Sequence, residues 1–356
     1  MSALLIVGHG TRDEDGAEEF RRFVSRVGVR AAERGTAEAV AGGFIELSPP
    51  PLKDAVAGLV EAGHRDLTAV PLILLAAGHA KGDIPAALAR EKERHPGLRT
   101  KYARPLGPHP VILDLLRRRL HETLTEAAEA AGADAVLLVG RGTTDPDGNA
   151  DLYRAARLLW ETTRDLGVRQ VEAGFVSLAE PSVPEGLARL RALGAERVVV
   201  LPFFLFPGVL PTRIHSQVRD WTAANPGLAA TVADVIGDCD ELADLVVERY
   251  LEADGRGGAP AGMNCDACVY RIALPGFEAR VGQEQRPHDH PDDPAHAHGH
   301  AHESHHHHHD HAQPHEHRHG TAAEPYAEVR SVPETRLSSP VGPPPPAMGR
   351  SDGYGN

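Results

Sequence analysis

The chain carries one pattern of residues twice, and this internal repeat limits the folds that it can adopt. The segment Leu4–Asp13 matches Val136–Asp145, and each reads as an apolar run followed by Gly-x-Gly-Thr. Two further pairs of blocks keep the same offset of 131–132 residues: Gly43–Ser48 with Gly174–Ala179, and Val70–Leu75 with Leu201–Phe206. Three matching blocks at one offset indicate a duplicated structural unit.

Each half alternates short Val/Ile/Leu-rich runs with stretches of helical period, which is typical of an α/β fold with a mainly parallel sheet. The sequence therefore predicts two duplicated α/β domains, each a mainly parallel sheet flanked by helices. The expected strands are Ala3–Val7, Ala39–Leu47, Leu67–Leu75 and Arg99–Ala103, then Ala135–Val139, Val171–Leu178, Arg197–Phe206 and Ala230–Asp234. The expected helices include Ala17–Arg34, Leu52–Glu61, Asp151–Asp165 and Pro184–Ala192.

The internal repeat and a change of composition near residue 255 divide the chain into four parts. Residues 1–130 are predicted to be a first domain that carries the reactive groups, and residues 131–254 are its repeat with a degenerate site. A Cys-x-x-Cys segment follows at 255–286, and a His- and Pro-rich tail at 287–356. The tail has few large apolar side chains to offset the loss of chain entropy, so we predict that it is disordered.

Charge and cysteine content exclude several classes of protein. The formal net charge is −13, which argues against a nucleic-acid partner held by a basic surface. No run of about 18 apolar residues is present, so no membrane span is expected. Three cysteines argue against a disulfide scaffold, and the first residues lack the basic region of a signal peptide, so a cytoplasmic location is predicted.

The strand ends of the first half deliver two imidazoles and a carboxylate. His9 follows the first predicted strand, Glu46 lies at the end of the second, and His79 follows the third. Ligands of open parallel sheets bind beyond the carboxyl ends of the strands, so the three side chains are predicted to converge on an active or metal site. Each of them alone is more commonly a capping residue or a solvated group.

The second half has lost these groups together, which strengthens the prediction. The position of His9 is taken by Arg141, that of Glu46 by Ser177, and that of His79 by Val209 or Leu210. This pattern indicates that the first half keeps the reactive groups and that the second half only lines the opposite side of the site.

The blocks Leu5–Asp13, Gly43–Leu47 and Gly78–Pro85 resemble the CbiX/SirB sirohydrochlorin chelatases, which are class II chelatases that need no ATP. The resemblance covers about residues 1–285 and includes the duplication of the long CbiX form. It implies insertion of a divalent metal into sirohydrochlorin, with cobalt leading to cobalamin and iron to siroheme. The family's two active-site histidines map onto His9 and His79, and Glu46 matches its acidic position.

The residues suit this chemistry. A neutral imidazole binds Co²⁺, Fe²⁺ or Ni²⁺ through one nitrogen, and a second histidine or Glu46 accepts the two protons that leave the macrocycle. No Walker phosphate loop is present in the sequence. Sirohydrochlorin carries many carboxylates, so basic groups are expected to hold it. The candidates by position are Arg12, Lys81 and Arg141, with Arg104 and Arg213 as further possibilities.

Cys265 and Cys268 form a Cys-x-x-Cys pair, which suits half a zinc site, a redox pair or two ligands of an iron–sulfur cluster. No second such pair exists, so a four-Cys zinc site within one chain is excluded. In long CbiX proteins a Met-x-Cys-x-x-Cys is associated with an iron–sulfur centre, and the resemblance implies a [4Fe–4S] cluster here. Cys239, a histidine or a second subunit would have to complete its ligands. Two alternatives remain for Cys265 and Cys268: a thiol pair without a function, or a site for another metal.

Histidine is concentrated in one tract: 15 of the 22 histidines lie between His288 and His319. Exposed imidazoles bind Co²⁺, Ni²⁺, Zn²⁺ and Cu²⁺, so the tract predicts metal capture or buffering and favours cobalt over iron as the substrate metal. Irregular spacing and an internal position argue against a purification tag.

Three functions are open at this point. The first is a cobalt chelatase, with iron as the alternative metal, that acts as a monomer or a homodimer. The second is a metal storage or delivery protein that works through the His tract. The third is a redox sensor centred on Cys265 and Cys268, which would leave the paired histidines unexplained.

Overall fold

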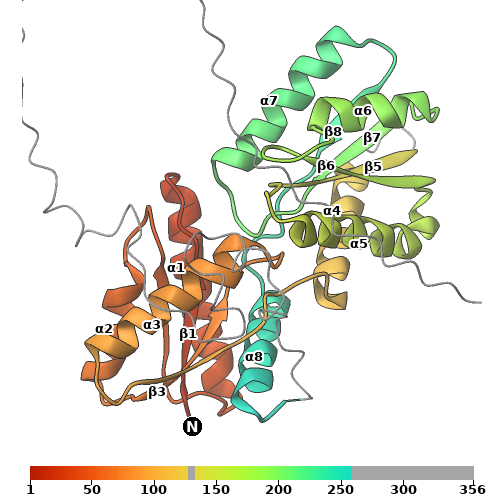
Figure 1. The fold of residues 1–356 in the computed structure, drawn as a ribbon. Helices are drawn as coiled ribbons and strands as arrows, with labels where there is room; N and C mark the ends of the chain where they lie inside the picture. The colour runs from red at the N-terminus through yellow and green to blue at the C-terminus, as the bar shows by residue number, and fades with distance from the viewer. Residues whose placement is uncertain (127–132, 258–356) are drawn as a thin grey trace, which may run out of the picture. The chain divides into compact units, whose positions relative to one another are not determined.

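The computed structural model describes residues 1–126 and 133–257, which contain two parallel four-stranded sheets (Figure 1). The first sheet has the order β2-β1-β3-β4, formed by β1 (Ala3–Gly8), β2 (Val40–Phe44), β3 (Asp66–Pro71) and β4 (Arg99–Tyr102). The second repeats it as β6-β5-β7-β8, formed by β5 (Ala135–Gly140), β6 (Gln170–Phe175), β7 (Arg197–Pro202) and β8 (Ala229–Val232). The predicted fold class is confirmed.

Helices connect these strands and cover the sheets. In the first half they are α1 (Glu14–Glu33), α2 (Leu52–Glu61), a π-helical turn η1 (His79–Asp83), α3 (Ile84–Arg94) and α4 (Pro110–Glu126). In the second half they are α5 (Pro146–Thr162), a 3₁₀ turn η2 (Arg164–Leu166), α6 (Val183–Ala192), α7 (Val209–Ala224) and α8 (Asp240–Asp254). Helices α4 and α8 were not expected from the sequence.

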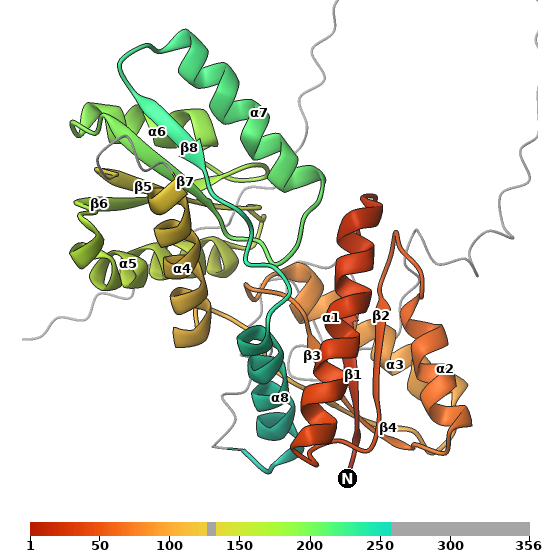
Figure 2. The same ribbon diagram turned by 180° about the vertical axis from the view of Figure 1, so that it is seen from behind.

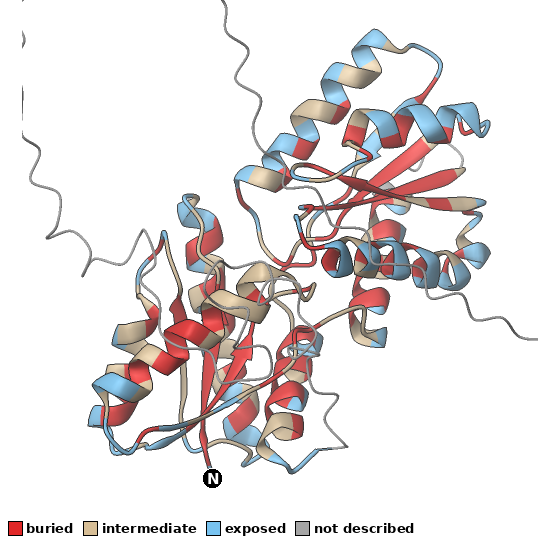
Figure 3. Ribbon diagram, in the orientation of Figure 1, coloured by how far each residue is buried: buried red, intermediate tan, exposed pale blue. Residues whose placement is uncertain are grey.

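Strands β1 and β5 are apolar and buried throughout, and both of their faces are covered (Figure 3). Ala3, Leu5 and Val7 of β1 pack in a cluster with α2 and α3, whereas Leu4 and Ile6 face a different cluster. Strand β5 alternates in the same way. The cluster that contains Leu4 and Ile6 also contains residues of β5 and β7, so the two sheets share one continuous hydrophobic core.

The last helix of each repeat packs away from its own sheet. Helix α8 packs on α1, β3 and β4 of the first sheet, and α4 packs on α5 and β7 of the second (Figure 1 and Figure 2). Each sheet is therefore covered by the final helix of the other repeat: α8 lies on the first sheet and α4 on the second. This exchange makes each layer depend on chain from the other repeat.

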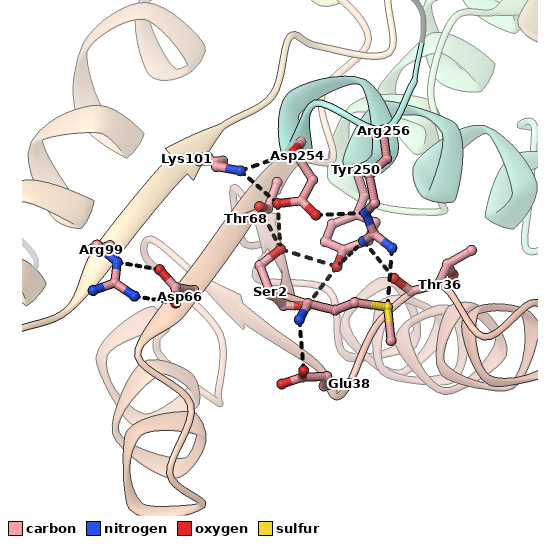
Figure 4. Close-up of polar contacts among 11 residues, drawn as sticks. Ser2, Thr36, Glu38, Asp66, Thr68, Arg99, Lys101, Tyr250, Asp254 and Arg256 are labelled. Carbon is pink, nitrogen blue, oxygen red and sulfur yellow. Dashed lines mark hydrogen bonds and ion pairs between the residues drawn. The ribbon is translucent and has the colours of Figure 1, made fainter.

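Ion pairs and a buried polar cluster fix α8 to the first sheet. Arg30 binds the Asp244 carboxylate through two nitrogens, at 2.8 and 2.7 Å. At the other end of α8, the buried Tyr250 hydroxyl donates to the Ser2 carbonyl at 2.6 Å (Figure 4). Ser2 Oγ lies 3.0 Å from Asp254 Oδ1, and Lys101 donates to the same carboxylate oxygen at 2.8 Å. The start of β1 and the end of α8 are thus joined by satisfied polar groups.

Two glycines allow the first turns of α1 and α5 to approach loops of the opposite repeat. A Cβ on Gly16 would lie 2.4 Å from the Pro207 carbonyl oxygen, and a Cβ on Gly148 would lie 3.1 Å from Ala77 Cβ. Pro207 and Ala77 belong to corresponding loops that follow the third strand of each repeat. The absence of a side chain at Gly16 and Gly148 therefore lets the halves meet near the predicted site.

Some predictions concern residues outside the described ranges. Cys265, Cys268, the His288–His319 tract and the predicted disorder of 287–356 all lie there. Within the described ranges, no helix combines the length and the apolar character needed to cross a membrane.

We expect Gly16→Ala to lower the free energy of unfolding by about 1–3 kcal/mol, because the added methyl forces backbone at Pro207 to move. The control is Gly58→Ala in α2, where nothing lies within 4 Å of the added Cβ. That change should raise stability by about 0.5–1 kcal/mol through helix propensity. Urea denaturation of both variants tests the close approach, and equal responses would contradict it.

Candidate functional site

His9 and His79 meet at the carboxyl edge of the first sheet. Strand β1 ends at Gly8, so His9 is the first residue beyond it, and His79 begins the turn η1 that follows β3. Their Nε2 atoms lie 2.8 Å apart, and the rings are nearly perpendicular, with centroids 4.0 Å apart. The predicted convergence of the two imidazoles is observed.

Each imidazole contacts a carboxylate through its other nitrogen. Glu46 Oε1 lies 3.2 Å from His9 Nδ1, and the Glu46 side chain is only 12 % exposed. Asp83 Oδ2 lies 2.6 Å from His79 Nδ1. A carboxylate at the second nitrogen fixes the ring orientation and leaves the first nitrogen aimed at its target. The two Nε2 atoms are therefore held facing each other.

Asp83 is the site residue that the sequence analysis missed. It stands four residues after His79 within η1, and a spacing of four on a helical turn places two side chains on one face. That spacing was the available signal. Short π-helical segments inside helices are frequent at functional sites, and η1 runs directly into α3.

Glu46 reaches His9 through a loop rather than from a strand end. The expected strand Ala39–Leu47 is wrong at its end, because β2 stops at Phe44. The Glu46 backbone N–H donates to the His9 carbonyl at 3.1 Å and keeps the two loops together. Gly10, with φ of 109°, sits so close that a Cβ there would lie 1.8 Å from the Glu46 carbonyl oxygen. The Gly-His-Gly pattern thus permits this contact.

Arg141 joins the site from the second half. Its Nη1 lies 3.3 Å from His9 Nε2, and its side chain is exposed. The residue that replaces His9 in the repeat therefore contacts His9 itself. Burial, then the neighbouring His79, then the Arg141 charge lower the pKa of His9 to about 4. His9 is consequently a neutral imidazole at physiological pH.

One assignment of protons satisfies these contacts. His9 carries its proton on Nδ1 toward Glu46, so its Nε2 lone pair accepts from Arg141 and from His79. His79 Nε2 then donates to His9, and its Nδ1 faces the Asp83 carboxylate. In this assignment the Nε2 atoms of His9 and His79 share one proton, which separates their two lone pairs.

The described residues contain no group of three or more His, Cys, Asp and Glu side chains arranged to hold a metal ion. Two imidazole nitrogens alone make a weak, open site. A metal bound to both Nε2 atoms at about 2.1 Å needs them about 3.0–3.4 Å apart, so the rings must separate by a few tenths of an ångström. Such a site suits a metal that passes through rather than one that stays.

A family model described as CbiX matches residues 3–123 and, a second time, residues 135–253. The chain belongs to the CbiX family. Among its relatives, the sirohydrochlorin cobaltochelatase of Priestia megaterium is 36 % identical over 274 residues, which cover 77 % of this chain and 86 % of the relative. The sirohydrochlorin ferrochelatase of the same organism is 32 % identical and covers 72 % of this chain and 92 % of the relative.

A solved structure supports the same membership. The sirohydrochlorin chelatase SirB from Bacillus subtilis subspecies spizizenii, in complex with cobalt, has a TM-score of 0.58 and 27 % identity. It covers 72 % of this chain and 97 % of that one. The resemblance to the CbiX family drawn from the sequence is therefore confirmed, including the duplication that the two family-model matches share.

The basic residues predicted to bind substrate differ in their surroundings. Lys81 donates to Asp145 at 2.7 Å and to Asp147 at 3.0 Å, and its side chain is only 10 % exposed. It thus links the two halves, and its charge is already compensated. Arg104 is paired with Glu252 in the same way. Arg12, Arg141 and Arg213 are exposed.

We expect the His9 imidazole to titrate with a midpoint of about 4, which proton NMR of the C2–H resonance can follow. Arg141→Gln should raise this midpoint, because it removes a positive charge that opposes protonation of His9. Arg141→Lys keeps the charge and serves as the control. A midpoint near the ordinary value of about 6.5 in the parent chain would refute the proton assignment.

Proposed function

We propose that this chain inserts a divalent metal into sirohydrochlorin without ATP, and that the metal is cobalt. The observation that carries the proposal is the pairing of His9 and His79 at 2.8 Å between Nε2 atoms, with a carboxylate at each Nδ1. Its support is the CbiX membership and relatives named for cobalt and iron chelation of sirohydrochlorin. Iron insertion for siroheme is the alternative.

The first step exchanges a proton for a metal ion. His9 is neutral and already presents a lone pair at Nε2, whereas His79 Nε2 carries the shared proton. Loss of this proton gives two lone pairs that face one another, and imidazole nitrogen is a good ligand for Co²⁺ and Fe²⁺. Glu46 and Asp83 keep both rings oriented while the proton leaves.

The second step passes the metal to the macrocycle. Two pyrrole N–H protons must leave as the divalent ion enters, so the overall charge is balanced. One proton returns to His79 Nε2, which the metal has just vacated, and the other passes to Glu46 or to water. With the proton released in the first step, two protons leave for each metal inserted. The site then regains its resting protonation.

Exposed arginines complete the proposal. Arg141 lies beside His9. Arg12 is three residues after His9 in the chain, on the same loop as His9. Guanidinium groups bind carboxylates in a bidentate manner, so these two residues are proposed to anchor acidic side chains of sirohydrochlorin. Lys81 is left out of this role because its ammonium group is bound to Asp145 and Asp147.

We expect His9→Ala and His79→Ala to abolish metal insertion while the fold persists, because each removes one Nε2 lone pair. Asp83→Asn should lower the rate about 10–100-fold, since the ring of His79 loses its orienting carboxylate. The matched control is His215→Ala, an exposed histidine on α7 that should leave the rate unchanged. Anaerobic absorbance assays measure the rate, and full activity of both active-site variants would refute the proposal.

The choice of metal requires its own measurement. We expect purified protein to accelerate Co²⁺ insertion into sirohydrochlorin more than Fe²⁺ insertion, relative to reactions without protein at the same pH. Faster iron insertion would indicate that the same site serves siroheme synthesis. No acceleration with either metal would favour the storage or delivery function.

The His288–His319 tract is proposed to capture and buffer metal for this site. A chain that ends at Gly282 tests this: it should insert metal at the full rate when metal is abundant and more slowly when metal is scarce. Lost activity at all metal concentrations would show that the tract takes part in insertion. Equal rates when metal is scarce would show that it is not a buffer.

A [4Fe–4S] cluster at Cys265 and Cys268 stays a prediction, and the described residues offer it little. Cys239 lies at the start of α8 against the hydrophobic core, and burial raises the pKa of its thiol. The thiolate that iron needs is therefore disfavoured at Cys239. We assign the cluster no part in the reaction.

A further inference from the structure

Two leucines adopt a backbone conformation that leucine avoids. Among the described residues, the non-glycine residues with φ in the left-handed region are Leu47, at 64°, and Leu178, at 58°. For a bulky residue this conformation is a genuine outlier, and it costs of the order of 1 kcal/mol or more. Glycine or asparagine at either position would avoid most of that cost.

The hydrogen bonds explain the geometry of both positions. The Ser48 N–H donates to the Glu46 carbonyl at 2.7 Å, and the Ala179 N–H donates to the Ser177 carbonyl at 2.7 Å. Each leucine is thus the central residue of a three-residue turn with an i to i+2 hydrogen bond. The form of this turn with positive φ is rare and strained. The same strained turn occurs once in each repeat.

Burial does not compensate this strain. Leu47 is 45 % exposed and Leu178 is 59 % exposed, so both project a large apolar side chain from a strained turn. Residues held in such conformations concentrate at ligand-binding sites, where the surrounding structure imposes them. A conformational cost without a packing benefit points to a contact that is made outside the folded chain.

Both turns adjoin the paired imidazoles. Leu47 directly follows Glu46, which contacts His9, and Leu178 directly follows Ser177, whose N–H donates to the Arg141 carbonyl at 3.1 Å. His9 and Arg141 contact one another, so the two turns flank one point. Backbone packing fixes them, because a Cβ on Gly142 would lie 2.0 Å from the Ser177 carbonyl oxygen, as at Gly10.

Both repeats have leucine at the centre of this turn, Leu47 and Leu178, but the neighbouring residues differ between the repeats. Histidine and glutamate of the first half become Arg141 and Ser177 in the second, whereas leucine occupies the central position of the turn in both. Metal chemistry therefore does not account for the leucines. The apolar face of a flat macrocycle that both halves touch does account for them.

We infer that Leu47 and Leu178 are the apolar contacts that hold the tetrapyrrole ring of the substrate against the His9–His79 pair. The inference rests on the proposed function and deepens it, because it names the residues that orient the ring rather than those that handle metal or protons. The two side chains are positioning residues for the macrocycle. Strain keeps them projecting toward the ligand in place of folding back onto the protein.

The test separates binding from metal insertion. Leu47→Gly and Leu178→Gly remove the side chain and relieve the positive φ, and the full chain is titrated with metal-free sirohydrochlorin, followed by absorbance. We expect Kd to rise about five-fold or more for each variant, which corresponds to about 1 kcal/mol. Thermal unfolding should occur at an unchanged or higher temperature, since strain is released. In turnover with metal, KM should rise far more than kcat falls.

The matched control is Leu193→Gly, which removes an equally exposed leucine, 61 % accessible, at the end of α6. Its Kd for sirohydrochlorin should equal that of the parent chain. A parent chain that binds and metallates sirohydrochlorin, with glycine variants that bind equally well, would overturn the inference and leave the proposed function standing. A marked loss of thermal stability in the glycine variants would also overturn it, by showing a structural role. A parent chain that binds no sirohydrochlorin would overturn both.

Discussion

The arrangement of the site depends on the contact between the Nε2 atoms of His9 and His79. The two imidazoles face each other with their Nε2 atoms 2.8 Å apart, and Glu46 and Asp83 hold the opposite nitrogens. Removing either carboxylate would let a ring turn away. The neutral state of His9 supplies a lone pair, and burial together with the neighbouring His79 and Arg141 lowers the pKa of His9 and so maintains that state. Geometry and electrostatics therefore favour the same exchange of proton for metal.

Duplication explains why a single chain builds both sides of this contact. Residues with a structural role recur in both repeats: Thr11 and Thr143 accept from the N–H of the aspartate two residues later, and each aspartate caps a helix. The paired imidazoles do not recur, and Arg141 takes the position of His9 in the second repeat. The exchange of α4 and α8 and the shared hydrophobic core tie the halves together. A fixed arrangement of the halves keeps Arg141 beside His9.

The sequence predicted the architecture and the central pair well, for physical reasons. Buried parallel strands are apolar on both faces, so their positions are visible as runs, and parallel strand ends gather at one edge, which placed His9 and His79 together. Asp83, the ion pairs of Lys81 and the exchange of α4 and α8 were missed. Lys81 was assigned to substrate, but its partners Asp145 and Asp147 lie more than sixty residues away in the chain. Contacts at such separations leave no periodic signal. The end of β2 was also overestimated, because a strained turn at Leu47 continues an apolar pattern.

We propose that the two facing imidazoles bind a divalent metal on its way into the macrocycle. Anomalous diffraction from crystals of the full chain, grown anaerobically with Co²⁺, tests it most directly. We expect a cobalt peak bonded to both His9 Nε2 and His79 Nε2, with the rings farther apart than in the metal-free site. An ordered cobalt ion bound elsewhere in the folded repeats, with the two imidazoles still sharing their proton at hydrogen-bonding distance, would contradict it.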